Sequence, residues 1–279
     1  MTPGRLLHHE ISGPADAPLL VLGPSLGTSM TVWEPHLTAL ATAFRVLRFD
    51  LPGHGGSPAT LLRDTGPGRT TVEELAQLVL ALADELAYDE FHYAGISLGG
   101  AIGARIAARC PGRVASLALV CTSAHFGEPG PWRERAELVR LKGTAPLLAT
   151  SPGRWFADPH QAGTPLGRAL LKNLADADPR GYAACCDALA TYDLRAELTH
   201  ITAPTLVIGG SQDTATPLHH AEELAAGIPH ATLRTVDCGH LAMEQPGAVA
   251  LALDTLLRPD RAMRSPAGPG TGGPRSVPG

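Results

Sequence analysis

Short apolar runs recur along this chain, and segments of helical period separate them. The runs occupy residues 19–22, 45–49, 91–94, 117–120, 205–208 and 232–236. A short run of this kind is typical of a strand buried on both faces, as in a parallel sheet. Strands that alternate with helices along the sequence need helices on both faces of such a sheet. The pattern therefore predicts an α/β fold with a mostly parallel central sheet flanked by helices.

The alternation stops between residues 125 and 200, and this interval divides the chain. It holds helical stretches at 133–142, 166–174 and 182–190, without a convincing strand. We expect residues 1–124 and 201–257 to form one core, and 125–200 to form a helical cap or lid over the strand ends. The tail, 258–279, is rich in Pro, Gly and Ser and buries too little apolar surface to offset the cost of ordering, so we expect disorder there.

Composition narrows the range of partners. The formal net charge is −5, from 22 basic and 27 acidic residues among 279. Nucleic-acid binding needs a basic face, so we expect no nucleic-acid partner. No stretch reaches the ~18 apolar residues of a membrane span, and the N-terminus has no apolar run typical of a signal peptide. The five cysteines follow no disulfide or zinc spacing, which indicates free thiols and a cytoplasmic protein.

The strongest chemical signal is the segment Gly95-Ile96-Ser97-Leu98-Gly99, which lies between a predicted strand and a helix-like stretch. In that context G-x-S-x-G predicts a nucleophile elbow, a turn so tight that only small residues fit on either side of the serine. The turn presents the hydroxyl at the carboxyl end of the strand, where ligands bind in such sheets. Ser97 is therefore the candidate nucleophile; the alternative is a glycine-rich turn with a spectator serine.

A serine hydroxyl at neutral pH needs a base, and two later loops offer the partners. Asp213 follows one predicted strand, and His240 follows the next. Ser, then acid, then His is the order that accompanies a nucleophile elbow. Both loops lie at the carboxyl ends of adjacent strands, so we predict a triad of Ser97, His240 and Asp213. Asp237 is the fallback acid, although it is too close to His240 in sequence to reach the far side of the ring easily.

Acyl transfer also needs N–H donors for the oxyanion. We expect one from the backbone of Leu98, directly after Ser97, and the other from Leu26 in the glycine-rich loop 23–28. Such a donor contributes on the order of 3 kcal/mol to the transition state. His54 lies in a turn after another strand and is interpreted as structural; a place at the border of the pocket is the alternative.

Together these motifs resemble those of the α/β-hydrolases, and within that superfamily those of the 3-oxoadipate enol-lactonases. The elbow and the Gly53-His54-Gly55 turn occur in many hydrolases of this fold. The loop Ser25-Leu26-Gly27-Thr28 replaces the His-Gly loop of many relatives and is more specific. Further agreement lies in Gly153-Arg154-Trp155-Phe156 and Gly181-Tyr182-Ala183-Ala184-Cys185. The resemblance covers residues 5–257 and implies the α/β-hydrolase fold with a helical cap insertion.

The resemblance also implies a reaction, the opening of 3-oxoadipate enol-lactone to 3-oxoadipate in the breakdown of aromatic compounds. It implies the Ser-His-Asp triad and neither a metal nor another cofactor. The substrate is a small anionic lactone, so the pocket should offer a cation or hydrogen-bond donors. Candidate cations are Arg133, Arg135 and Arg154, with Trp132 and Trp155 as walls. For each arginine the alternative is a solvated helix face.

Other functions are compatible with the same motifs. Carboxylesterases, C–C bond hydrolases and cofactor-free haloperoxidases share this scaffold, and a substrate panel separates them. A dehalogenase is disfavoured, because it would resemble enzymes with an aspartate at the elbow, where this chain has Ser97. A different class is a ligand-binding receptor on the same fold that turns over slowly. No sequence feature indicates an oligomeric state.

Overall fold

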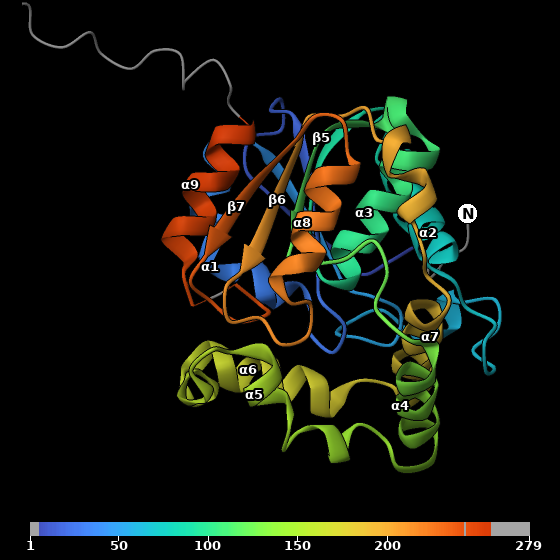
Figure 1. Ribbon diagram of the computed structural model, residues 1–279. Coiled ribbons are helices and arrows are strands. Elements are labelled where there is room, and N and C mark those ends of the chain that lie inside the picture. Colours follow the sequence, from blue (N-terminus) through green and yellow to red (C-terminus); the bar gives the residue numbers. More distant parts are fainter. Residues whose placement is uncertain (1–5, 243, 258–279) are drawn as a thin grey trace, which may run out of the picture.

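The computed structural model describes residues 6–242 and 244–257, so the predicted disordered tail, 258–279, lies outside the described residues. Its centre is a seven-stranded sheet in the order β1-β3-β2-β4-β5-β6-β7 (Figure 1). β1 (His9–Ser12) runs antiparallel to β3 (Arg45–Phe49), and the other described neighbours are parallel. The remaining strands are β2 (Leu19–Gly23), β4 (Phe91–Ile96), β5 (Val114–Val120), β6 (Thr205–Gly210) and β7 (Ala231–Val236). The predicted mostly parallel sheet is confirmed.

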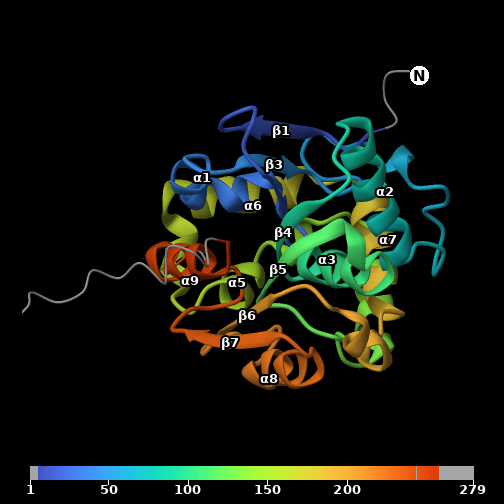
Figure 2. The ribbon, with the colours of Figure 1, turned by 90° about the horizontal axis from the view of Figure 1, so that it is seen from above.

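Helices cover both faces of the sheet (Figure 2). On one face lie α1 (Glu34–Leu40) and α9 (Pro246–Leu257), and on the other lie α2 (Val72–Glu85), α3 (Leu98–Arg109) and α8 (Leu218–Gly227). α2 begins where Thr71 accepts a hydrogen bond from the N–H of Glu74, and its buried face carries Leu75, Val79 and Leu82. None of the described helices is long and apolar enough to cross a membrane.

The strand register aligns the carboxyl ends of the parallel strands. β2 and β4 are paired at Gly23 and Gly95, and β4 and β5 are paired at Ile96 and Val120. The same alignment continues from β5 through β6 to β7. The loops after these strands therefore meet at one edge of the sheet, as expected from the sequence.

The segment between β5 and β6 is helical and lies beyond this edge (Figure 1). It contains α4 (Pro129–Lys142), α5 (Ser151–Trp155), α6 (Pro165–Asp176) and α7 (Pro179–Ala190). α4 and α7 pack against each other, and the start of α7 contacts the turn after β3. There the N–H of Asp178 donates to the Gly53 carbonyl (2.8 Å), and a Cβ on Gly53 would lie 2.6 Å from the Cα of Gly181. Only glycine at both positions lets the two backbones approach this closely.

Candidate active site

Ser97 lies in the turn between β4 and α3, where the backbone is strained. Its φ of 54° and ψ of −117° fall outside the regions that most L-residues adopt. Its N–H donates to the Val120 carbonyl (3.0 Å), and its own carbonyl accepts from the Thr122 hydroxyl (2.6 Å). A Cβ on Gly95 would lie 2.3 Å from the backbone of Gly99, so the turn closes only around small residues. This is the local geometry that the elbow motif predicts.

His240 and Asp213 approach each other from the loops after β7 and β6. His240 Nδ1 lies 2.9 Å from Asp213 Oδ2, and both side chains are buried. An ionised carboxylate only accepts hydrogen bonds, so the proton belongs on Nδ1 and Nε2 keeps its lone pair. His240 and Ser97 line the same pocket. The fold thus brings the three candidate triad residues to one edge of the sheet, an arrangement suited to base-assisted nucleophilic attack.

A set of hydrogen-bond donors surrounds Asp213. Its Oδ1 accepts from the N–H groups of Ala215 (2.7 Å) and Thr216 (2.9 Å), and its Oδ2 accepts from the Thr216 hydroxyl (2.7 Å). Burial would raise the pKa of Asp213, but the charge of His240 and the hydrogen bonds from His240 and Thr216 lower it below its usual value. The Thr216 hydroxyl also lies 3.3 Å from His240 Nδ1. Aspartate side chains commonly bind a backbone donor two residues on, which is Ala215 here. Sequence reasoning missed Thr216, which lies three residues after Asp213.

The fallback acid, Asp237, lies elsewhere. Its Oδ1 accepts from the Ser211 hydroxyl (2.7 Å) and from the Gln212 side-chain amide (2.8 Å) at the exposed surface. Among the described residues, Asp213 is therefore the acid in contact with His240.

A pocket opens over Ser97 and His240. The sheet edge and the helical segment above it both supply its walls. The residues predicted from the sequence that line it are Leu26, Trp132, Arg135, Arg154 and Trp155. The lining also includes residues that the sequence did not indicate, among them Phe126, Thr150, Ser151 and Tyr182. Arg133 is the exception. It is exposed on α4 and lines a separate depression with Pro67 and Glu137, so the geometry gives it no contact with this pocket.

The two arginines of the pocket differ in their surroundings. The guanidinium of Arg135 lies over the ring of Trp132, with its Cζ 5.3 Å from the ring centroid. The Trp132 ring is fixed in turn by a hydrogen bond from its Nε1 to the Phe126 carbonyl (2.8 Å). Burial lowers the pKa of the half-buried Arg154, and the nearby charge of Arg135 lowers it further. Within the described part of the chain neither arginine has an acid within ion-pair distance, and both line the pocket.

The two predicted oxyanion donors are both placed beside Ser97. Leu98 is the first residue of α3, where backbone N–H groups have no acceptor within the helix. Leu26 lines the pocket in the loop after β2. That loop is closed by a hydrogen bond from the N–H of Thr28 to the Ser25 carbonyl (3.1 Å). Both residues thus lie next to the space in front of Ser97, and the oxyanion-binding role of their N–H groups stays a prediction.

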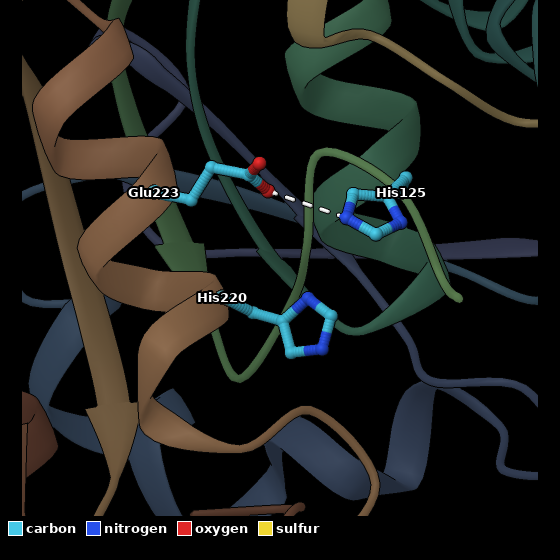
Figure 3. Close-up of side chains that lie close together, drawn as sticks. All are labelled: His125, His220 and Glu223. Carbon is cyan, nitrogen blue, oxygen red and sulfur yellow. Dashed lines mark ion pairs between the residues drawn. The ribbon is translucent and has the colours of Figure 1, made fainter.

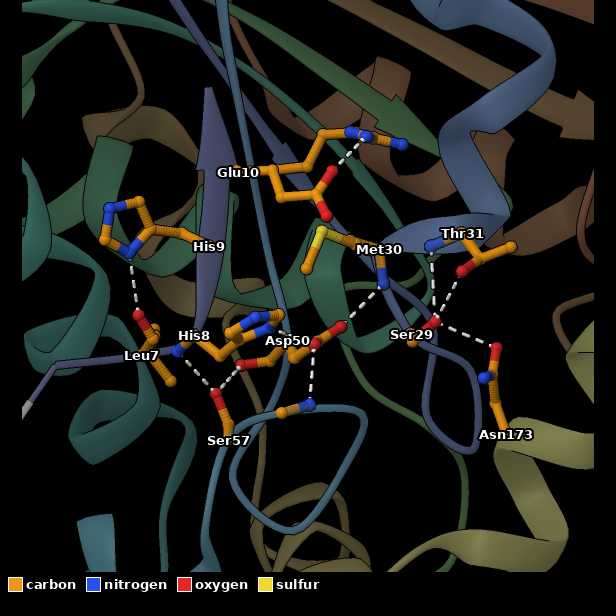
Figure 4. Close-up of polar contacts among 12 residues, drawn as sticks. Leu7, His8, His9, Glu10, Ser29, Met30, Thr31, Asp50, Ser57 and Asn173 are labelled. Atoms are coloured by element: carbon orange, nitrogen blue, oxygen red, sulfur yellow. Dashed lines mark hydrogen bonds and ion pairs between the residues drawn. The ribbon is translucent and has the colours of Figure 1, made fainter. Parts of the chain in front are cut away.

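Asp50, at the end of β3, is the buried centre of the contacts that hold this loop (Figure 4). Its Oδ1 accepts from the N–H of Met30 (2.8 Å), and its Oδ2 contacts the N–H of Gly56 (2.9 Å) and His8 Nδ1 (2.8 Å). One carboxylate thus joins the segment before β1, the loop after β2 and the turn after β3. Cross-connections of this kind fix the backbone of a loop without regular secondary structure.

A second group of titratable side chains lies where the loop after β5 meets α8 (Figure 3). His125 Nε2 is 3.6 Å from Glu223 Oε2, and ligand atoms of His125, His220 and Glu223 lie within 4.8 Å of one another. Zinc accepts such a ligand set. However, His125 Nδ1 accepts the N–H of Gly127 (3.3 Å), so in the neutral ring Nε2 carries the proton toward Glu223 and offers no lone pair. His220 Nδ1 lies 2.6 Å from the Ser123 hydroxyl. These contacts fasten the loop to α8, and we assign no metal to the group.

Comparison with known proteins places the chain among hydrolases. The model of the alpha/beta hydrolase family matches residues 19–253. The chain is 34% identical over 254 residues to 3-oxoadipate enol-lactonase 2 of Acinetobacter baylyi, covering 90% of this chain and 93% of that protein. It is 32% identical over 246 residues to a protein of Stutzerimonas stutzeri provisionally named carbamate hydrolase RutD, covering 84% and 89%.

Solved structures give the same result. The enol-lactonase from Burkholderia xenovorans matches with a TM-score of 0.85 and 35% identity, covering 90% of this chain and 96% of that chain. The resemblance to enol-lactonases expected from the motifs is thereby confirmed. Because the family match extends from β2 into α9, the chain belongs to the alpha/beta hydrolase family.

Proposed function

We propose that this chain is a serine hydrolase that opens 3-oxoadipate enol-lactone to 3-oxoadipate, in the breakdown of aromatic compounds. The observation that carries the proposal is the pocket in which Ser97 and His240 share walls with Arg135 and Arg154. An acyl-transfer centre beside two cations suits a small lactone that bears a carboxylate. The relatives named as enol-lactonases support the same reaction.

The first half of the proposed reaction breaks the lactone ring. Ser97 Oγ attacks the ring carbonyl while His240 Nε2 takes the hydroxyl proton. Negative charge forms on the carbonyl oxygen, which the N–H groups of Leu26 and Leu98 stabilise. The ring C–O bond then breaks, and the leaving enolate oxygen takes the proton from His240. The enol becomes a ketone, and the acyl group stays on Ser97.

The second half releases the acyl group. Water attacks the acyl carbonyl while His240 takes its proton, and the same proton returns to Ser97 Oγ as the ester bond breaks. Asp213 stays ionised and holds the proton on His240 Nδ1 throughout. Side chains and water account for each bond and proton, so the proposed reaction uses no metal or other cofactor.

We further propose that residues 125–200 act as a cap that selects the substrate, over a core of residues 1–124 and 201–257. The reacting side chains of the pocket come from the core, whereas Trp132, Arg135, Arg154, Trp155 and Tyr182 come from the cap.

We also propose that the protein acts in the cytoplasm. Its five cysteines carry free thiols, which fits a reducing compartment.

The test is lactone turnover by the wild type and by Ser97→Ala. The enol-lactone is generated in situ, and its ultraviolet absorbance is followed after enzyme is added. Rapid loss with the wild type that Ser97→Ala abolishes supports both the reaction and the nucleophile. Circular dichroism of Ser97→Ala provides the control for folding.

A panel of neutral aryl esters and carbamates runs beside the lactone. Hydrolysis of these compounds without turnover of the lactone would reject the substrate and keep the serine chemistry. Binding of the lactone with far less than one turnover per second would favour the receptor function. No reaction with any compound would reject the proposal.

A further inference from the structure

His54 is the buried residue that connects the loop carrying Leu26 to the turn after β3. Its side chain is 1% exposed, and it does not line the pocket. Its Nε2 accepts the N–H of Gly27 (3.1 Å), and its Nδ1 lies 3.1 Å from the Pro52 carbonyl. A carbonyl can only accept, so Nδ1 carries the proton and Nε2 is an acceptor. Both ring nitrogens of this histidine are thus used in one fixed tautomer.

The ring is neutral in the range where hydrolases work. Burial lowers the pKa of His54 to about 4, against smaller opposite effects of the Pro52 carbonyl and of the charges on Asp50 and Asp178. A protonated ring would present a donor to the Gly27 N–H and break the contact. The acceptor at Nε2 is therefore available throughout neutral pH.

The contact at Gly27 fixes the backbone next to Leu26. Gly27 has a φ of +83°, which an L-residue rarely adopts, and a Cβ there would lie 3.1 Å from Leu174 and 3.3 Å from Tyr182. The N–H of Gly27 belongs to the peptide that follows Leu26, so holding it sets the orientation of Leu26 itself. The direction in which the Leu26 N–H points depends on that orientation.

In addition to the contacts of its two nitrogens, the His54 ring stacks on a residue of the cap. His54 and Tyr182 stack with their ring centroids 5.7 Å apart and an interplanar angle of 29°. In the same turn, the Gly53 carbonyl accepts a hydrogen bond from the N–H of Asp178 (2.8 Å). This bond anchors the start of α7. His54 thus lies between α7 and the loop that carries Leu26.

We propose that His54 is a positioning residue for the oxyanion hole, and that it holds the Leu26 loop in its working conformation through the Gly27 N–H. Stacking on Tyr182 links that conformation to the docking of α7. The inference rests on the proposed serine hydrolase chemistry, and it applies to any ester that Ser97 attacks.

Two substitutions separate positioning from packing. His54→Phe keeps the ring and the stacking but removes the acceptor, whereas His54→Gln keeps an acceptor near Nε2 and removes the ring. Positioning predicts that His54→Phe lowers kcat by about 100-fold with little change in KM, because a misplaced catalytic group costs this much. It predicts that His54→Gln recovers at least about tenfold of that loss. A packing role predicts the opposite order, and that order would overturn the proposal.

His36→Phe is the matched control. His36 is also buried, and burial lowers its pKa to about 4, yet neither of its ring nitrogens has a hydrogen-bond partner among the described residues. This control should leave kcat unchanged. If His54→Phe does not fold, His54→Gln is compared with the wild type by NMR. Positioning predicts that the slow exchange of the Gly27 amide is retained, and rapid exchange together with full activity would refute it.

A fluorophosphonate that labels Ser97 keeps this test independent of the lactone. Its phosphoryl oxygen needs the same N–H donors, and intact mass reports the labelling rate. Slow labelling of His54→Phe beside rapid labelling of the wild type supports positioning even if the lactone is not a substrate. Equal labelling rates would reject positioning, even if the lactone is turned over by the wild type.

Discussion

Replacing Arg154 with glutamine should weaken the binding of an anionic substrate selectively. Arg154 lines the pocket, is half-buried, and forms no ion pair within the described residues. Burial removes part of the water around its guanidinium and thereby lowers its pKa. We expect a carboxylate that enters the pocket to form a charge-assisted hydrogen bond with this guanidinium.

The expected size follows from that contact. Hydrogen bonds to charged groups contribute about 1.5–3 kcal/mol. At about 1.4 kcal/mol for each factor of ten, Arg154→Gln should raise KM for the anionic lactone by roughly 10- to 150-fold. The bond forms in the ground state and the transition state alike, so kcat should change little. KM for a neutral aryl ester should stay within about threefold of the wild type.

Arg133→Gln is the control. Arg133 carries the same charge on the neighbouring helix α4, but it lines a different depression. Steady-state kinetics on the lactone and on the neutral ester are measured for both variants and the wild type. An unchanged KM for the lactone in Arg154→Gln, or equal increases for both substrates, would refute the electrostatic reasoning.

Two further predictions concern the stability of the elbow and of the acid. Gly99→Ala should lower Tm by several degrees, because the new Cβ would lie 2.4 Å from the backbone of Gly23 and overpacking costs about 1–3 kcal/mol. Gly130→Ala is the control in the same thermal melt, because no atom lies within 4 Å of its new Cβ. The pKa of Asp213 is lowered in the folded state, so its ionisation stabilises the fold above the unfolded pKa of about 3.9 and this contribution is lost as pH falls through the folded value. The stability difference between wild type and Asp213→Asn in urea should therefore shrink below about pH 4, and a difference that is constant with pH would contradict this assignment.

The sheet and its edge could be predicted because they depend on local signals. The apolar runs gave each central strand, and the loops after these strands carry Ser97, Asp213 and His240, which the structure brings together. Proximity of the three residues required only that parallel strands end at one edge. Chain order and strand position were therefore sufficient for this part of the site.

The walls of the pocket were harder to predict, because they depend on how the helices of the insertion pack. Arg133 and Arg135 were equal candidates by sequence, but residues two apart on a helix face different directions, and only Arg135 reaches the pocket. Tyr182 belongs to α7, and its place depends on the contact between Gly53 and Gly181, which are far apart in the sequence. The sequence alone indicates only a structural role for His54. Its hydrogen bond with the Gly27 N–H joins two separate loops, so it could not be predicted without the fold that brings them together.

The pocket takes its reacting side chains from the strand-end loops and most of its other walls from the helical insertion. This division has a consequence for how such a protein can acquire new substrates. Mutations in the helical insertion alter the shape and charge of the walls, while the strand-end loops that hold Ser97, Asp213 and His240 keep their own contacts. A descendant could therefore acquire a new substrate in small steps without losing its chemistry at any of them. Contacts between the two parts set the boundary of that freedom. At these points, such as Gly53 with Gly181 and the bond from the Leu241 N–H to the Trp155 carbonyl (3.1 Å), a change in the insertion reaches the loops of the core.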